Sequence, residues 1–380
     1  MLNRLSLRAV LYGVIGLLAL LALSQTLLGL RQALEQREHA QRVLDSNATA
    51  DLLLAAAAGW AAERGGTAMA LGAEPPASAE RRAALEAQRR AADAAMAEAR
   101  GRLQASGRLA DPAIARHTTG FASAEAAVAG LRRRADAALA QPRPAREAGL
   151  PEQWWTGMSG MIEASQALRL AQQVEDEGAE ARLAALQELK HFAWVASEYL
   201  GRERGTMAGL LARAAPLTPL QLEQLAMHRG RVETAWGMIE AMLEHGAGAP
   251  LAGAAEAARQ RLFGPFQQTR RAVYAAGVAG QPYPVSGEQW WQDSTAVIDQ
   301  LRGLSNAAGA EAARLAATLA AEGGPRGAAG RPAGAGPGGG AGRLAAGVAP
   351  RAAPAAGAGR GDAPAGGARA GGRDPRRRPA

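Results

Sequence analysis

The chain has 380 residues, of which 4% are aromatic, and its richness in alanine, leucine and arginine favours an all-α fold over strands. It has no cysteine, its five histidines lack metal-ligand spacing, and no nucleotide-binding or hydrolase motif is present, so we expect no metal, no cofactor and no enzymatic activity. The net charge of +8 comes from residues 323–380, and residues 1–322, with 33 basic and 33 acidic side chains, lack a nucleic-acid-binding surface.

An apolar stretch without charges, residues 9–30, follows Arg4 and Arg8. It is long enough to cross about 30 Å of hydrocarbon as a helix. The preceding arginines predict a cytoplasmic N-terminus, so we expect residues 1–30 to anchor the chain in the inner membrane and the rest to lie in the periplasm. The alternative is a cleaved signal peptide, but the apolar stretch exceeds the usual ~7–15 residues and helix-compatible sequence continues beyond it.

The first expected helical unit covers residues 31–151. Pro75 and Pro76 end its first long helix because proline lacks an amide donor and fixes φ. Ser78 and Asp111 are suited to cap the next two helices. The helices of this unit are expected at residues 30–71, 79–105 and 112–140.

The second expected unit, residues 152–322, repeats this plan and ends in a long exit helix. Its first helical region is interrupted between Pro216 and Pro219, where Thr218 is suited to cap the next helix. The helices of this unit are expected at residues 152–212, 220–244, 251–276 and 286–322.

Residues 323–380 are nearly all alanine, glycine, proline and arginine, a composition that cannot bury enough apolar area to fold. These residue types have GC-rich codons, and the whole chain has a single lysine, Lys190. We therefore interpret the segment as a disordered tail translated out of frame from a longer receptor gene. The alternative is a genuine basic tail that contacts anionic lipid or nucleic acid.

Two motifs recur at nearly the same spacing, which indicates an internal duplication. Glu152-Gln153-Trp154-Trp155 returns as the segment from Glu288 to Trp291, and Glu63-Arg64-Gly65 returns as the segment from Glu203 to Gly205. The tryptophan pairs could form an aromatic cage, but tryptophans at a helix start more often pack the end of a bundle. We expect an elongated, internally duplicated helical bundle.

Arg64 and Arg204 lie on apolar helix faces with no acidic residue three or four positions away. A buried guanidinium stays charged, so each needs acceptors from elsewhere in the fold. One hypothesis places a small planar oxyanion between the two forks, and the other pairs Glu63 with Arg204 and Glu203 with Arg64. The residue types do not decide between these two arrangements.

The candidate ligand-binding residues come from the two motif helices. The threonines offer hydroxyl donors and the glycines allow close approach of helices, although both residue types also occur in ordinary tight packing. The candidates are Arg64, Arg204, Thr67, Thr206, Gly65 and Gly205.

At these residues the chain resembles the nitrate- and nitrite-sensing (NIT) domain family, helical sensors of bacterial chemoreceptors, histidine kinases and a transcription antiterminator. The resemblance covers about residues 45–280 and rests on the motif helices, Trp60–Leu71 and Trp194–Leu211. It implies a ligand held between paired helices by Arg64 and Arg204. The segment from Tyr283 to Leu304 resembles the one that leads methyl-accepting chemotaxis receptors to a second membrane helix.

We therefore expect a membrane-anchored sensor of a bacterial signal-transduction receptor, similar to a chemoreceptor, that binds nitrate or nitrite and shifts a two-state equilibrium. The family analogy implies a homodimer, and nucleic acid is not expected as a partner. Two alternatives stay open: a membrane-tethered structural or adaptor bundle that binds no ligand, and the sensor part of a histidine kinase.

Overall fold

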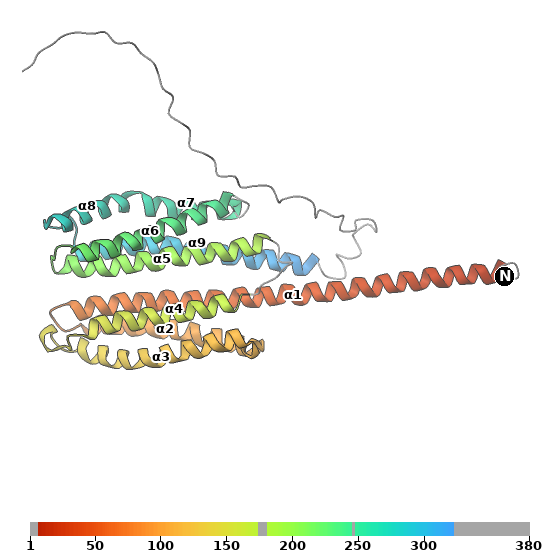
Figure 1. The fold of residues 1–380 in the computed structure, drawn as a ribbon, viewed down its shortest axis with the longest axis horizontal. Helices are drawn as coiled ribbons and strands as arrows, with labels where there is room; N and C mark the ends of the chain where they lie inside the picture. The colour runs from red at the N-terminus through yellow and green to blue at the C-terminus, as the bar shows by residue number, and fades with distance from the viewer. Residues whose placement is uncertain (1–6, 174–180, 245–247, 323–380) are drawn as a thin grey trace, which may run out of the picture. The chain divides into compact units, whose positions relative to one another are not determined.

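The computed structural model describes residues 7–173, 181–244 and 248–322, and all regular secondary structure in them is helical, which confirms the predicted fold class (Figure 1). The expected tail at residues 323–380 lies outside the described residues. The α-helices are α1 (Leu7–Gly72), α2 (Ala79–Ala105), α3 (Pro112–Leu139), α4 (Leu150–Ala171), α5 (Ala181–Ala212), α6 (Pro219–Met242), α7 (Gly248–Phe263), α8 (Pro265–Ala279) and α9 (Gly287–Glu322).

Three predicted helix starts are confirmed by their hydrogen bonds. The side chains of Ser78 and Asp111 each accept from backbone amides in the first turn of α2 and α3. Thr218 and Gln221 form a reciprocal capping box at the start of α6, with Pro219 at the first helical position. These interactions are local in sequence, which is why the residue types alone predicted them.

Two predicted helices are each divided. The region 152–212 forms α4 and α5, which enter different bundles, and α4 ends where the side-chain amide of Gln172 donates to the Ser46 carbonyl oxygen at 3.1 Å. The region 251–276 is split between α7 and α8 because Pro265 has no amide proton to continue the ladder of α7. The helical region expected at residues 152–212 therefore contains a break that the sequence did not locate, and the single helix predicted at residues 251–276 is wrong.

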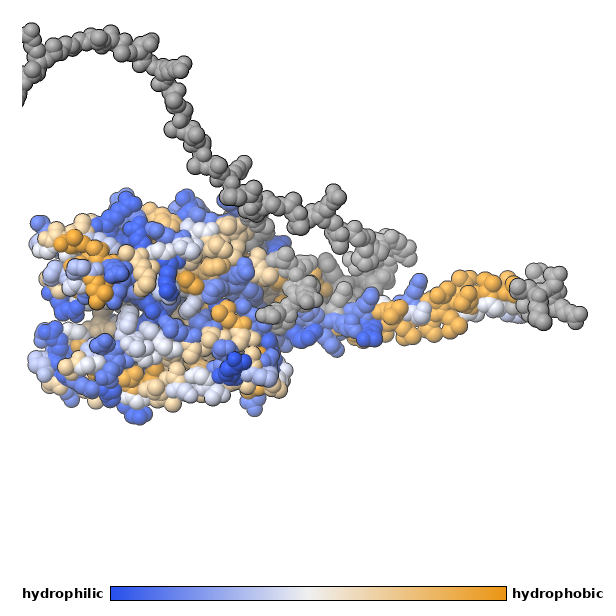
Figure 2. Space-filling model, viewed as in Figure 1, coloured by the Kyte–Doolittle hydropathy of each residue, from blue (hydrophilic) through white to orange (hydrophobic). Residues whose placement is uncertain are grey.

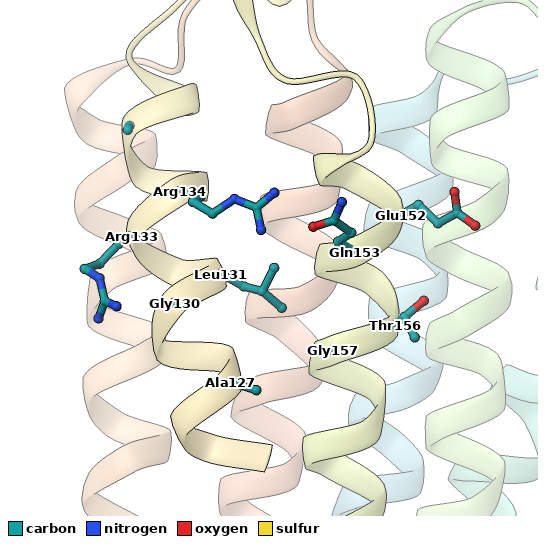
Figure 3. Close-up of a pocket in the computed structure, with 10 residues that line it drawn as sticks. Ala127, Gly130, Leu131, Arg133, Arg134, Glu152, Gln153, Thr156 and Gly157 are labelled. Carbon is teal, nitrogen blue, oxygen red and sulfur yellow. The ribbon is translucent and has the colours of Figure 1, made fainter. Parts of the chain in front are cut away.

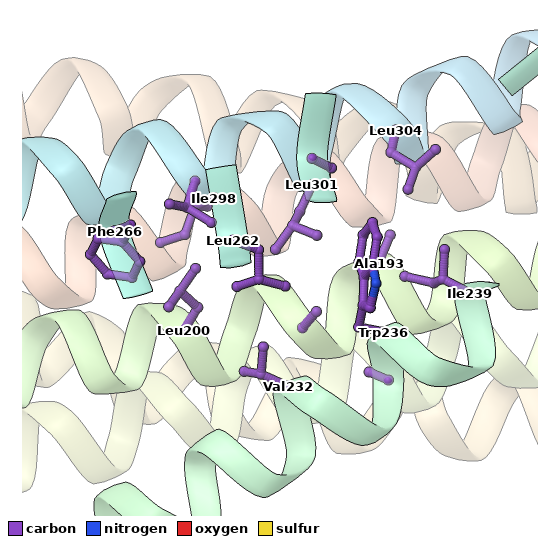
Figure 4. Packing of buried hydrophobic residues seen from close by; sticks show 14 of the residues in the cluster. Ala193, Leu200, Val232, Trp236, Ile239, Leu262, Phe266, Ile298, Leu301 and Leu304 are labelled. Carbon is purple, nitrogen blue, oxygen red and sulfur yellow. The ribbon is translucent and has the colours of Figure 1, made fainter. Parts of the chain in front are cut away.

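The described helices form two bundles, each with its own apolar core. The first bundle comprises α1 to α4 and buries Trp60, Phe121 and Trp154. The second comprises α5 to α9, whose side chains converge on a shared layer (Figure 4). Residues of α4 that follow the unit boundary expected at residue 151 pack into the first core. The repeated Glu-Gln-Trp-Trp motif stands at the start of the last helix of each bundle.

Helix α1 has two parts with different surroundings. From Val10 to Leu34 its large apolar side chains are exposed (Figure 2), whereas from Ala40 onward it packs into the first bundle and lies along α5 and α9 of the second. Among the described residues, α1 is the one helix long and apolar enough to cross a membrane. An N-terminal signal sequence can also meet this requirement of length and apolar composition.

Candidate functional site

A cavity of about 340 Å³ lies between the two bundles. Mostly small side chains of α1, with Gln88 of α2, form one wall, and a mixture of apolar, polar and charged side chains of α5 and α9 forms the other. Of the six candidate residues, Arg204 lines this cavity, whereas the other five are not among its described lining residues. The residues that matter for the site are Ala58, Ala61 and Ala62 of α1, Ser197, Glu198 and Arg204 of α5, and Thr295, Asp299 and Arg302 of α9.

Arg204 is buried and lacks a carboxylate partner among the described residues. Its Nη1 donates to the Thr295 hydroxyl at 2.7 Å, and its guanidinium carbon lies 4.0 Å from the centroid of the Trp291 ring. Its Nε has no hydrogen-bond acceptor in the described part of the chain. Burial, together with the charge of Arg64, lowers the pKa of Arg204 to about 10, so the side chain is still a cation at neutral pH. Arg204 is therefore a buried cation without a neutralising partner.

Arg64 is neutralised from the other bundle. Its Nη1 and Nη2 donate to the two carboxylate oxygens of Glu198 at 2.8 and 3.1 Å, and Nη1 also donates to the Ser159 hydroxyl at 2.9 Å. Arg202 donates to the same carboxylate at 2.8 Å. Burial alone would raise the pKa of Glu198, but Arg64 and Arg202 together lower it, so the carboxylate is ionised. The fork of Arg64 is thus occupied by an internal anion.

The motif glutamates bind arginines of their own bundles. Glu63 accepts from Arg89 at 2.8 Å and from Arg132 at 2.6 Å. Glu203 accepts from the Tyr274 hydroxyl at 2.6 Å and pairs with Arg270 at 2.8 Å. The hypothetical reciprocal pairs with Arg64 and Arg204 are not formed among the described residues, because each glutamate is already held inside its bundle.

The motif glycines accommodate tryptophans from the opposite bundle. A Cβ atom at Gly65 would lie 2.8 Å from the Trp291 ring, and one at Gly205 would lie 2.7 Å from the Trp155 ring. Each indole therefore lies against a helix of the other bundle at a place where a side chain would collide. The glycines are needed for this close approach. The sequence predicted that they allow close packing but did not identify the tryptophans that pack against them.

The first tryptophan of each pair fixes a motif helix within its own bundle. Trp154 and Trp290 are fully buried, and their indole N–H groups donate to the carbonyl oxygens of Arg64 and Arg204 at 3.0 and 3.3 Å. This arrangement supports the packing interpretation rather than an aromatic cage.

The two candidate threonines lie away from the cavity wall. Thr67 is buried, and its hydroxyl has no hydrogen-bond partner in the described structure. Thr206 is half-buried and lines a separate groove between the bundles, near Glu152 and Glu288. Neither threonine contacts Arg204 through a hydrogen bond among the described residues.

The two halves of the site differ at two positions. When the two Glu-Arg-Gly motifs are aligned, Glu198 corresponds to Ala58 and Arg202 corresponds to Ala62. Both alanines line the cavity in which Arg204 stands. In the first half of the site, Glu198 neutralises Arg64 and Arg202 binds Glu198. In the second half, alanines stand at both equivalent positions, and the cavity lies beside them.

A larger hollow of about 910 Å³ lies between α3 and α4 (Figure 3). Figure 3 shows Arg134 directed toward α4 and Arg133 directed away from the hollow. Both arginines are exposed, and Arg134 is paired with Glu147. This hollow contains no buried charge that needs a ligand among its described lining residues.

Comparison with known proteins identifies the family and the fold. The sequence profile described as nitrate and nitrite sensing (NIT) matches residues 55–313, more than half of the chain. The chain belongs to the NIT family. No curated protein matches it. The solved structure of the NasR transcription antiterminator is similar to this NIT protein with a TM-score of 0.60 and 17% identity, covering 80% of this chain and 76% of that one, which shows a shared fold.

Several site residues of this NIT protein were not found from the sequence. Glu198, Thr295 and the second tryptophan of each pair reach the motif arginines from distant parts of the chain. An alignment of the two Glu-Arg-Gly motifs could have identified Glu198. In that alignment a glutamate in one half stands opposite an alanine, Ala58, in the other, although the motifs themselves are identical.

Proposed function

We propose that this NIT protein is the sensor of a bacterial signal-transduction receptor and that it binds one small monovalent oxyanion, nitrate or nitrite, at Arg204 in the cavity between its bundles. The observation that carries the proposal is the buried Arg204 guanidinium, which lacks a carboxylate among the described residues and faces a cavity. A buried cation of this kind needs a counterion.

The charges around the motif arginines support a monovalent ligand. The cluster has one positive charge in excess, and Asp51, which also lines the cavity, is paired with Lys190 at 2.5 Å rather than with Arg204. A monovalent anion would make the cluster neutral, whereas a divalent anion would reverse its charge. The cluster consists of four arginines, Arg64, Arg202, Arg204 and Arg302, and three carboxylates, Glu163, Glu198 and Asp299.

The Glu198–Arg64 pair shows how a planar anion fits such a site. There the guanidinium binds two oxygens of one planar group, next to the Ser159 hydroxyl and 4.7 Å from the centroid of the Trp155 ring. At Arg204 the equivalent hydroxyl and indole are present, and the carboxylate is replaced by the cavity. Nitrate and nitrite present two oxygens in a plane, as a carboxylate does.

The proposed site involves only one motif arginine, Arg204, whereas the hypothesis from the sequence placed one anion between Arg64 and Arg204. An anion shared between Arg64 and Arg204 would have to displace Glu198, which holds Arg64 in a bidentate pair. We therefore assign the ligand to Arg204 and the structural role to Arg64. Gly65 and Gly205 support the site through their tryptophan contacts.

The receptor role rests on α1 and on the family. We propose that α1 anchors the chain in the inner membrane, with the bundles in the periplasm, and that the protein acts as a homodimer in a chemoreceptor-like or histidine-kinase receptor. In support, the apolar side chains from Val10 to Leu34 are exposed and follow two arginines. A ligand-free adaptor bundle would explain Arg64, which is neutralised, but leaves the charge of Arg204 unexplained.

Isothermal titration of the full chain in detergent tests the proposal. We expect nitrate or nitrite to bind with one anion per chain, sulfate to bind more weakly, and Arg204→Gln to abolish binding. The matched control is Arg259→Gln, which removes an exposed arginine paired with Glu256 and should leave binding unchanged. Absence of nitrate and nitrite binding by the wild type, or wild-type affinity in Arg204→Gln, would refute the anion site.

A further inference from the structure

Arg302 is a second arginine in the wall of the same cavity. It is half-exposed, and its Nη1 lies 3.6 Å from a carboxylate oxygen of Asp299, one turn earlier on α9. In the buried ion pairs Arg64–Glu198 and Arg270–Glu203, the nitrogen and oxygen atoms are only 2.8 Å apart. Arg302 is therefore close to the site but loosely held.

The other half of the site shows what a second arginine does there. Arg202 bridges two carboxylates, donating to Glu198 at 2.8 Å and to Glu163 at 2.7 Å. When the two Glu-Gln-Trp-Trp motifs are aligned, Glu163 corresponds to Asp299, so the acidic residue is kept. The position equivalent to Arg202 is Ala62, so the arginine from α1 is absent. Arg302 places a guanidinium beside Asp299 from α9 instead.

The geometry of α9 directs Arg302 toward the anion position. Thr295, Asp299 and Arg302 share one face of the helix, since they are spaced by three and four residues. Long side chains on a helix lean toward its N-terminus, which for Arg302 means toward Asp299 and then Thr295. Thr295 is the residue that holds Arg204, about 10 Å along the helix axis from Arg302 at ~1.5 Å per residue.

We propose that Arg302 is the second cationic ligand of the anion, closing over it from the solvent side while Arg204 binds it from the inside. This inference rests on the proposed anion site. The bound anion then stands between two arginines as Glu198 stands between Arg64 and Arg202. Asp299 holds Arg302 in the ligand-free protein and competes with the anion for it.

Nitrate titrations of four variants of the full chain test this role. Arg302→Gln should weaken nitrate binding about tenfold, since one charge-assisted contact is lost, while one anion still binds per chain. Arg302→Lys should recover part of this loss because it restores the charge without the fork. Asp299→Asn should tighten binding a few-fold because it releases Arg302. The matched control is Arg314→Gln, since Arg314 also pairs with a carboxylate three residues earlier on α9 but does not line the cavity.

The signs of these effects separate binding from structure. A purely structural Asp299–Arg302 pair predicts that both neutral variants weaken binding, and that result would overturn the inference. Wild-type affinity in Arg302→Gln, with binding lost in Arg204→Gln, would reject the role of Arg302 and leave the proposed function intact. If the wild type itself binds no nitrate, the inference and the proposed function both fail.

Discussion

Glu198 and Ala58 occupy equivalent positions in the two bundles when the Glu-Arg-Gly motifs are aligned, and of the two only Glu198 supplies a carboxylate to the motif arginine opposite it. The duplicated site is therefore asymmetric. One half is complete within the chain, and the other half has a cavity at the place of the acidic side chain.

Ala58→Glu should convert the second half into a copy of the first. The new carboxylate would lie in the cavity wall facing Arg204, so we expect nitrate binding to be lost and the melting temperature of the ligand-free protein to rise. Calorimetric titration and thermal circular dichroism measure the two effects. Ala58→Gln has nearly the same size without the charge, and an equal rise in melting temperature for both variants would contradict the electrostatic explanation.

The two motif arginines should differ in their effect on stability. Arg204→Met removes a buried cation that lacks a partner among the described residues, so we expect the free energy of unfolding to increase. Arg64→Met leaves the buried Glu198 with Arg202 alone, and should cost about 3 kcal/mol. Urea unfolding of both variants measures the difference, and similar losses in the two would show that Arg204 is already neutralised.

Alanine at either motif glycine should weaken the contact between the bundles. The added methyl group collides with Trp291 at Gly65 or with Trp155 at Gly205, at a cost of about 1–3 kcal/mol for an overpacked contact. The indole fluorescence should change together with the unfolding midpoint. Gly101→Ala is the control, because a Cβ atom there meets nothing within 4 Å and α2 should gain slightly in stability.

Two buried glutamates should give opposite pH dependences of stability. Burial raises the pKa of Glu203 despite Arg270, so its charged form costs stability as the pH rises from the ordinary carboxyl range through the raised pKa. Arg64 and Arg202 outweigh burial and lower the pKa of Glu198, so its contribution is full above the ordinary carboxyl value and is lost as the pH falls through the lowered pKa.

Urea unfolding between about pH 2.5 and pH 7 measures these trends, with the Glu198 effect in the lower part of this range and the Glu203 effect in the upper part. The destabilisation caused by Glu203→Gln should shrink as the pH rises, whereas that caused by Glu198→Gln should shrink as the pH falls. Parallel trends for the two variants would be inconsistent with the assigned protonation states.

The proposed membrane topology is open to a direct labelling test. The chain has no cysteine, so Thr119→Cys introduces a single exposed thiol on α3. A membrane-impermeant maleimide should label it in cells whose outer membrane has been permeabilised. Labelling that requires lysis of the inner membrane would place the bundles in the cytoplasm.

The sequence predicted those parts of the fold that depend on neighbouring residues. The caps at Ser78, Asp111 and Thr218 are examples, since their partners lie two or three positions away. It failed at the division between α4 and α5, where helix-compatible composition continues although the chain leaves one bundle for the other.

The candidate site was predicted in part for the same reason. Apolar surroundings along one helix identified Arg204 as a buried arginine, but the acceptors of both motif arginines lie on other helices. Glu198 is 134 residues from Arg64, and Thr295 is 91 residues from Arg204. Local patterns carry no information about such distant partners, and only the internal repeat could have related them.

Trp291 lies between the cavity residue Arg204 and helix α1. The Trp291 ring lies against the Arg204 guanidinium and, through its outer edge, against the bare backbone of α1 at Gly65. The same indole therefore contacts both the Arg204 side chain and α1, so any displacement of Arg204 that moves this ring would be passed to α1. Because α1 is one helix from Leu7 to Gly72, its contact with Trp291 at Gly65 and its apolar N-terminal segment belong to one continuous element.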